Sequence, residues 1–167
     1  MENHQQINQD SGNTEWYTPP HIIRAARLTM GGIDLDPASS EAANKRVGAD
    51  HFFSEMGLFW EWRGRVWMNH PFSRVGNKAW IEKLIEEYSA GRVSEACCIT
   101  FAATSEKWFQ PLMQFPQCYL SPRTQYMLPD GKVKKGVTKG SVVTYLGPNL
   151  SAFALNFDWL GAIKVAY

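Results

Sequence analysis

The chain of 167 residues has few of the side chains that hold disulfide-rich or metal-binding proteins together. It contains three cysteines, two of which are the adjacent Cys97 and Cys98 in an apolar run, so we expect buried reduced thiols rather than disulfide bonds. The histidines are His4, His21, His51 and His70. They show no spacing typical of zinc ligands, either with one another or with the cysteines, so we expect no metal site.

Long apolar runs and an excess of one charge are also absent. No apolar run approaches the roughly 18 residues that a membrane span requires, and residues 1–12 lack the apolar core of a signal peptide. We therefore expect a cytoplasmic protein. The 17 basic and 16 acidic residues give a net charge of +1, so any contact with nucleic acid has to come from a local basic patch.

The length and composition fit one ordinary domain. With 44% apolar residues, the chain can bury a sizeable core, and a second folded domain is not expected. Residues 1–12 are rich in Gln and Asn and show no apolar periodicity, which predicts a disordered tail. Residues 13–167 are expected to form the single folded domain, and they contain no internal repeat.

Hydrophobic periodicity and turn residues predict helices that alternate with strands. Helices are predicted over 18–30, 41–47, 77–90, 104–109 and 150–157, the third of them capped by Asn77. Strands are predicted over 33–36, 51–53, 65–69, 95–101, 118–120, 141–146 and 162–166. This order favours an α/β sandwich with a mainly parallel sheet, to which the late strands and the Asp130-Gly131 turn add an antiparallel edge.

Two of the predicted strands end in residues that suit chemistry. One leads into 34–40, where aspartates precede small residues that let a ligand approach the backbone; the other ends in Asn69-His70-Pro71-Phe72. In an open α/β sheet, ligands bind beyond the carboxyl ends of the strands. If both ends lie on the same edge, a cofactor at the first can present a group to a base held at the second, which describes group transfer.

The second strand end has the residues that chemistry on an exocyclic amino group needs. The lone pair of such an amine is conjugated with the base ring, and accepting both of its hydrogen bonds draws the lone pair out. The side-chain oxygen of Asn69 is one acceptor and the backbone carbonyl of residue 70 can be the second, while Phe72 offers a flat face to a base. The alternative is an ordinary strand-to-loop junction at which Pro71 ends the ladder.

Taken in order and spacing, these motifs resemble those of the small phage-type DNA adenine methyltransferases, which modify the exocyclic N6 amino group with S-adenosylmethionine. The resemblance runs from about residue 15 to the last strand and implies a Rossmann-like methyltransferase sandwich. The matching parts are 15–19, 32–39, Gly57-Leu58, Trp62, Gly64, 66–72, Trp80, Thr100, Trp108-Phe109, Arg123 and Gly147.

The resemblance implies a set of residues that bind the cofactor: Tyr17, Thr18, Pro19, Asp34, Asp36, Pro37, Ala38, Ser39 and Glu55. Residues 17–19 would lie against the methionine part, 36–39 would form the main cofactor loop, and Asp34 or Asp36 would accept hydrogen bonds from the ammonium or ribose. Glu55 would lie near the adenosine, although Met56 stands where family members often carry Asp. Without the other motifs, Tyr17 would be interpreted as a residue that packs on the first helix, and Asp34 as a residue that caps a helix or turn.

The catalytic residues implied by the resemblance are Asn69, His70, Pro71 and Phe72, and two of them depart from the family pattern. His70 stands where proline is usual; its backbone carbonyl remains, and Pro71 still favours an extended residue 70, but the rigidity of the proline ring is lost. Phe72 replaces tyrosine and keeps the stacking face. We assign His70 no role as a base, because the methylated amine can lose its proton to water.

The implied partner is double-stranded DNA with a flipped adenine, and the sequence indicates no obligate protein partner; a phage-encoded enzyme would act in the host cytoplasm. The basic residues expected to contact DNA are Arg74, Arg123, Lys132, Lys134 and Lys135, together with the nearby Lys139. The lysines can equally belong to a solvated hairpin that protects an edge strand, and Arg74 to a surface ion pair. Methylation of cytosine N4 or of RNA, or an idle DNA-binding protein, are the alternative functions.

Overall fold

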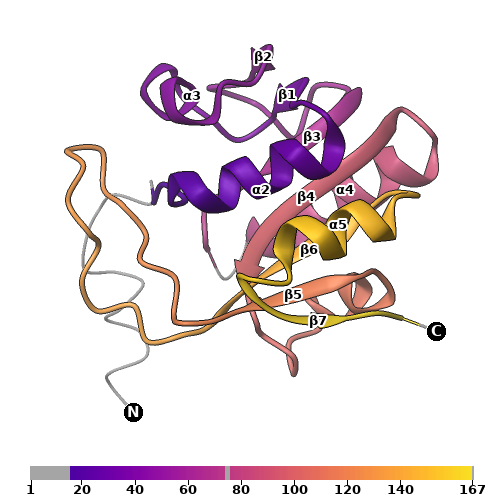
Figure 1. The fold of residues 1–167 in the computed structure, drawn as a ribbon. Helices are drawn as coiled ribbons and strands as arrows, with labels where there is room; N and C mark the ends of the chain where they lie inside the picture. Colours follow the sequence, from indigo (N-terminus) through magenta and orange to yellow (C-terminus); the bar gives the residue numbers. More distant parts are fainter. Residues whose placement is uncertain (1–15, 74–75, 167) are drawn as a thin grey trace.

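The computed structural model describes residues 16–73 and 76–166 and is built on one sheet of seven strands (Figure 1). The strands are β1 (Leu35–Asp36), β2 (His51–Phe52), β3 (Gly64–Met68), β4 (Val93–Phe101), β5 (Gln117–Leu120), β6 (Ser141–Leu146) and β7 (Gly161–Lys164). Their order across the sheet is β2-β1-β3-β4-β6-β5-β7. Strands β2, β1, β3 and β4 pair in parallel, and the pairs β4/β6, β6/β5 and β5/β7 are antiparallel. The predicted α/β sheet, with a parallel part and an antiparallel edge, is thereby confirmed.

Helices cover both faces of this sheet. They are α2 (Pro20–Met30), α3 (Glu41–Val47), α4 (Gly76–Ser89), α5 (Leu150–Phe157) and the short 3-10 helix η1 (Gln110–Gln114). Side chains alternate along each strand, so Trp67 and Cys97 pack with α2 and α5, whereas Met68 and Cys98 pack with α4. Figure 1 shows α2 and α5 together in front of the sheet and α4 behind it. The core is therefore divided into two apolar layers.

Local capping explains why several boundaries agree with the sequence. Pro20 begins α2 where its missing N–H costs nothing, and Gly31 ends the helix at φ 76°. The hydroxyl of Ser40 accepts from the N–H of Ala43 and starts α3. Asn149 starts α5 in the same way. The bounds predicted for α3, β6 and α5 are therefore confirmed.

Two sequence-based predictions are wrong. Asn77 does not cap α4, which begins one residue earlier at Gly76; the hydroxyl of Ser73 accepts from the N–H of Gly76 instead. The helix predicted over 104–109 is absent from the described residues, where turns lead into η1, and Pro111 occupies the first turn of that 3-10 helix. The tail predicted for residues 1–12 lies outside the described residues.

The parallel pairing brings the two chemically interesting strand ends together. Leu35 of β1 lies opposite Val66 of β3, so both strands end at the same edge of the sheet. The loop that follows β1 and the loop that follows β3 therefore leave side by side. All three cysteines are buried in the core, and no helix of the described residues is both long and apolar enough to cross a membrane.

Candidate active site

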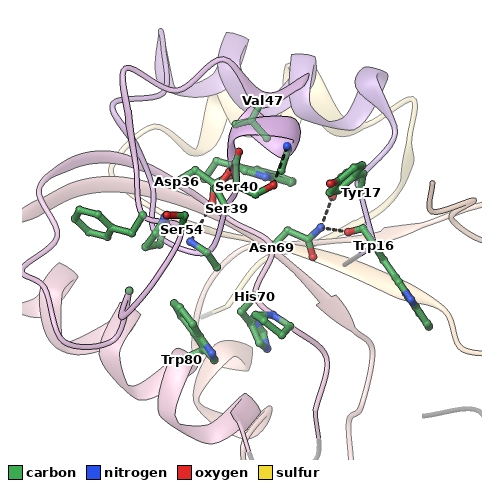
Figure 2. Close-up of a pocket in the computed structure, with 18 of the residues that line it drawn as sticks. Trp16, Tyr17, Asp36, Ser39, Ser40, Val47, Ser54, Asn69, His70 and Trp80 are labelled. Atoms are coloured by element: carbon green, nitrogen blue, oxygen red, sulfur yellow. Dashed lines mark hydrogen bonds between the residues drawn. The ribbon is translucent and has the colours of Figure 1, made fainter. Parts of the chain in front are cut away.

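A pocket of about 220 Å³ opens at the carboxyl ends of β1 and β3. Asn69 lies at its centre, with the loop after β1 on one side and His70 and Trp80 on the other (Figure 2). The site residues expected from the sequence that line this pocket are Tyr17, Thr18, Asp36, Pro37, Ala38, Ser39, Glu55, Asn69, His70, Pro71 and Phe72. The structure therefore gathers residues from four separate stretches of the chain around one cavity.

The Asn69 amide is held in one orientation by the segment that precedes α2. Its Nδ2 donates to the backbone carbonyl of Trp16 at 2.7 Å and to the hydroxyl of Thr18 at 3.1 Å (Figure 2). Because a carbonyl only accepts hydrogen bonds, the NH₂ group has to face Trp16. The side-chain oxygen of Asn69 is consequently turned the other way and serves as an acceptor.

His70 is a buried part of the pocket wall. Its side chain is 1% exposed, its Nε2 lies 2.8 Å from Oδ1 of Asn77, and its ring stacks on Trp80 with centroids 6.3 Å apart. Burial lowers the pKa of His70 to about 4, while the hydrogen bond to Asn77 acts in the opposite direction. The imidazole is therefore neutral at neutral pH.

Phe72 belongs to an aromatic cluster beside the pocket. Its ring centroid lies 4.6 Å from that of Phe101, 5.6 Å from that of Tyr126 and 5.8 Å from that of Trp16. The Tyr126 hydroxyl is fixed by a 2.8 Å hydrogen bond with Ser141. The cluster gives Phe72 a fixed place at the edge of the cavity, as a stacking surface requires.

Asp36 is the buried carboxylate of the site. It is 3% exposed, and its Oδ1 accepts from the N–H of Ala38 at 3.2 Å. Burial raises the pKa of Asp36 to about 7, although hydrogen bonds from Ala38 and Ser39 act to lower it. No basic side chain of the described residues forms an ion pair with Asp36. A cationic or hydroxyl group of a ligand would supply the missing partner.

The loop after β1 packs tightly against Gly57, where a β-carbon would lie 2.0 Å from the carbonyl oxygen of Pro37. The Gly57 carbonyl accepts from the indole of Trp62, and Trp62 stacks on Trp80 at 6.0 Å. Only glycine allows this approach, so residue 57 supports both the loop after β1 and the wall that holds His70. The exposed Glu55 lies at the rim of the same segment.

Two of the residues expected to bind the cofactor do not line the pocket. The Asp34 carboxylate is bound by Arg65, whose Nε and Nη2 donate to it at 2.8 and 2.7 Å. This interaction with Arg65 lowers the pKa of Asp34 to about 2. Pro19 precedes the first residue of α2 and lines a second cavity instead. Of the two aspartates left open by the sequence, the structure brings only Asp36 to the cavity.

The basic residues expected at DNA lie mostly in the segment 121–140. Lys132 and Lys135 are exposed, and Lys132 forms a surface ion pair with Asp130 at 3.7 Å. The ammonium of Lys134 lies 5.6 Å from the centre of the Trp16 ring, and Arg123 is exposed. Lys139 lies over Phe101 in a similar way, and Arg74 is outside the described residues.

Three residues near the pocket had no functional role in the sequence analysis. Arg46 lines the cavity, with its guanidinium 5.0 Å from the centre of the Tyr17 ring. Trp80 and Asn77 hold the His70 ring. Arg46 looks like an ordinary basic residue in the last turn of a helix, and Asn77 resembles a helix cap, so only their contacts reveal them. The described residues contain no cluster of three His, Cys, Asp or Glu side chains suited to a metal.

Comparison with known proteins identifies one family. A family model described as DNA N-6-adenine-methyltransferase (Dam) matches residues 5–145, which include the Asn69 strand end, the Asp36 loop and the basic segment. No curated protein matches the chain. The match spans most of the sequence and agrees with the fold and with the residues gathered around the pocket. The chain therefore belongs to the Dam family of adenine-specific DNA methyltransferases.

Proposed function

We propose that this chain transfers a methyl group from S-adenosylmethionine to N6 of an adenine flipped out of double-stranded DNA. The observation that carries the proposal is the fixed amide of Asn69, whose NH₂ group is held by Trp16 and Thr18. Its oxygen is thereby left as an acceptor in the same pocket as the buried Asp36. An acceptor for an amine and a buried carboxylate without a basic partner among the described residues are what an amino-methyltransferase needs.

The residues of the pocket fit the proposed cofactor. S-adenosylmethionine, when bound, supplies a methyl group on a positively charged sulfur together with an ammonium group and ribose hydroxyls. The buried Asp36 carboxylate suits the ammonium or a hydroxyl, because either would stabilise its charged form. The residues proposed to hold the cofactor are Tyr17, Thr18, Asp36, Pro37, Ala38, Ser39 and Glu55.

The target amine would be activated by hydrogen bonds alone. The Asn69 oxygen and the backbone carbonyl of His70 accept its two hydrogens, which directs the nitrogen lone pair out of the base plane and toward the methyl group. Phe72 supplies a ring on which the flipped base stacks. After the transfer the amine loses a proton to water, so no residue of the chain has to act as a base.

DNA would lie against the segment 121–140, which has five basic residues against one acidic residue in a chain whose net charge is only +1. Its lysines can pair with phosphates without reading sequence. Two of them, Lys134 and Lys139, lie over the rings of Trp16 and Phe101 respectively. The cytoplasmic location and the lack of an obligate protein partner stay predictions from the sequence.

The test is methylation of duplex DNA by the purified protein, with mass spectrometry of the nucleosides released. We expect N6-methyladenine, and we expect Asn69→Ala to lower kcat by on the order of 100-fold or more, since it removes one acceptor of the target amine. Glu82→Ala, at an exposed position of α4, is the control and should leave kcat unchanged.

Other products would contradict the proposal in distinct ways. N4-methylcytosine as the product, or methylation of RNA alone, would assign the site to a different amine. If the Asn69→Ala variant methylates DNA as fast as the parent, Asn69 takes no part in the reaction. If calorimetry detects no S-adenosylmethionine binding with or without DNA, the chain is an idle binding protein that retains the fold.

A further inference from the structure

His70 is a polar side chain buried in the wall of the pocket, and the proposed chemistry uses only its backbone carbonyl. A buried polar ring is costly unless its nitrogens are hydrogen-bonded, so its partner indicates what the ring does. That partner is Asn77 on α4, whose Oδ1 lies 2.8 Å from Nε2. Asn77 is itself buried, so the bond is shielded from water.

The bond fixes the form of the imidazole. Oδ1 of Asn77 only accepts, which places the hydrogen of the neutral ring on Nε2 of His70. The other nitrogen, Nδ1, is buried and has no partner within the described residues. The ring is thus anchored at one nitrogen.

Two aromatic rings, one stacked and one edge-on, also contact the His70 ring. Its stack on Trp80 is supported from behind, because Trp80 in turn stacks on the buried Trp62. Phe72 meets the ring edge-on, with centroids 5.8 Å apart. A ring held by Asn77, Trp80 and Phe72 cannot change its rotamer without leaving a cavity or an unpaired polar group in the core.

Asn77 is tied to the loop after β3 a second time through its backbone. Its N–H donates to the carbonyl of Ser73 at 3.1 Å, and the N–H of Ser73 donates to the carbonyl of Pro71 at 2.9 Å. The side chain of Asn77 therefore holds residue 70, and its backbone holds the residues that follow. Through these two attachments, residues 70–73 are fixed to α4, which is 14 residues long.

Among the described residues, no backbone N–H donates to the carbonyl of residue 70, the second acceptor of the proposed reaction. A proline at this position would have fixed φ by its ring, whereas histidine has no such restraint. We propose that Asn77 is a positioning residue that acts through the His70 imidazole to hold the residue 70 carbonyl at the target amine. This inference rests on the proposed function and assigns the restraint on the second acceptor to a residue of α4.

The proposal predicts that the role of Asn77 depends on the histidine. Asn77→Ala should lower kcat for adenine methylation on the order of tenfold, because a small displacement of a reacting group has such effects, while the Kd of S-adenosylmethionine stays within about twofold. In a His70→Pro background the ring of proline restrains the backbone, so adding Asn77→Ala should change kcat by less than about twofold. Glu82→Ala on the same helix is the matched control.

Each other result overturns the proposal. An unchanged kcat in Asn77→Ala shows that the residue positions nothing. Equal losses in the histidine and proline backgrounds show that it acts other than through the imidazole, and an inactive His70→Pro shows that the imidazole does more than position the carbonyl. A parent protein that methylates no DNA overturns the proposed function together with this inference. If the parent is active but the effect of Asn77→Ala does not depend on His70, only the inference is overturned.

A measurement on the parent protein covers the case in which Asn77→Ala does not fold. In ¹⁵N NMR of labelled histidine, His70 should appear as the neutral ring with hydrogen on Nε2 throughout the neutral pH range. A hydrogen on Nδ1, or a ring that titrates like an exposed histidine, would show that the bond to Asn77 does not form.

Discussion

Asp34 and Asp36 are two positions apart and have opposite surroundings. Asp34 faces Arg65, whose hydrogen bonds lower the pKa of its carboxyl to about 2, whereas burial raises the pKa of Asp36 to about 7. The first carboxylate is already paired within the protein, and the second is costly until a ligand pairs with it. At the scale of single residues, this difference separates a structural ion pair from a proposed cofactor contact.

Asp36→Asn should have opposite effects on stability and on binding. The pKa of about 7 in the folded state lies above the ordinary aspartate pKa of 3.8, so the free energy of unfolding is highest below pH 4 and falls as the pH rises through 7. Each pKa unit corresponds to about 1.4 kcal/mol, so we expect the variant to gain about 2–4 kcal/mol over the parent at pH 8 and little at pH 4. Urea denaturation at both pH values measures this difference.

The same variant should bind S-adenosylmethionine at least about tenfold more weakly, since it loses the charge that the ammonium or ribose would meet. For the parent, calorimetry should show weaker binding as the pH falls below 7, where Asp36 becomes protonated. If the variant matches the parent in both stability and binding, Asp36 does not bind the cofactor.

Asp34→Asn should lower stability and leave the binding of S-adenosylmethionine unchanged. It breaks the bond to Arg65, and because both side chains are about one third exposed, solvent limits the expected loss of stability to about 1 kcal/mol at pH 7. Since the folded pKa of Asp34 lies below the ordinary aspartate pKa of 3.8, this contribution is present above pH 4 and disappears as the pH falls to 2. The Kd of S-adenosylmethionine, measured by calorimetry, should stay unchanged; a tenfold weakening would assign Asp34 to the cofactor.

At the scale of elements, the pocket depends on how three loops meet at the edge of the sheet. The loop after β1, the loop after β3 and the segment 53–62 converge there, and Gly57 packs against Pro37 where no side chain fits. Trp62 and Trp80 extend this contact to His70. A change in one loop is therefore expected to reach the others.

Gly57→Ala tests this dependence. The added methyl group would lie 2.0 Å from the Pro37 oxygen and 2.9 Å from the Trp80 ring, so the loop after β1 has to move. We expect a loss of stability of about 1–3 kcal/mol by thermal denaturation and weaker binding of S-adenosylmethionine. Gly140→Ala is the matched control, because a β-carbon there meets no atom within 4 Å. Equal behaviour of the two variants would contradict the proposed support.

At the scale of the whole molecule, charge is unevenly distributed. The chain carries a net charge of +1, yet the segment 121–140 has five basic residues and a single acidic one. A bridge from Met127 to Tyr17 ties this segment to the residues in front of α2. The part of the chain proposed to meet phosphates is thus attached to the part that orients Asn69.

The double variant Lys132→Gln/Lys135→Gln should weaken DNA binding without changing the cofactor site. Removing two phosphate contacts should reduce the slope of log K against log salt by about 2, measured by fluorescence anisotropy over a salt series. Arg63→Gln is the control, since this exposed cation precedes β3 at the opposite edge of the sheet from the pocket. An unchanged slope would show that Lys132 and Lys135 do not contact the DNA phosphates.

Local signals predicted much of this protein from its sequence. Caps, prolines and glycines act on their immediate neighbours, so the bounds of α3, β6 and α5 followed from the order of residues alone. The fold class and the family followed from motifs in sequence order, and the match over 5–145 confirms the family. The predicted helix over 104–109 failed because the chain forms turns there before η1, a choice that no local pattern in this stretch revealed.

The tertiary structure decided which side chains meet. Nothing near Asn69 in the sequence indicates that Trp16, 53 residues earlier, orients its amide, or that Arg65 pairs with Asp34 from 31 residues away. Asn77 looked like a helix cap and instead holds His70. The sequence by itself determined the elements and the chemical groups, because these depend on neighbouring residues, whereas the pairing of those groups depends on how strands and helices pack.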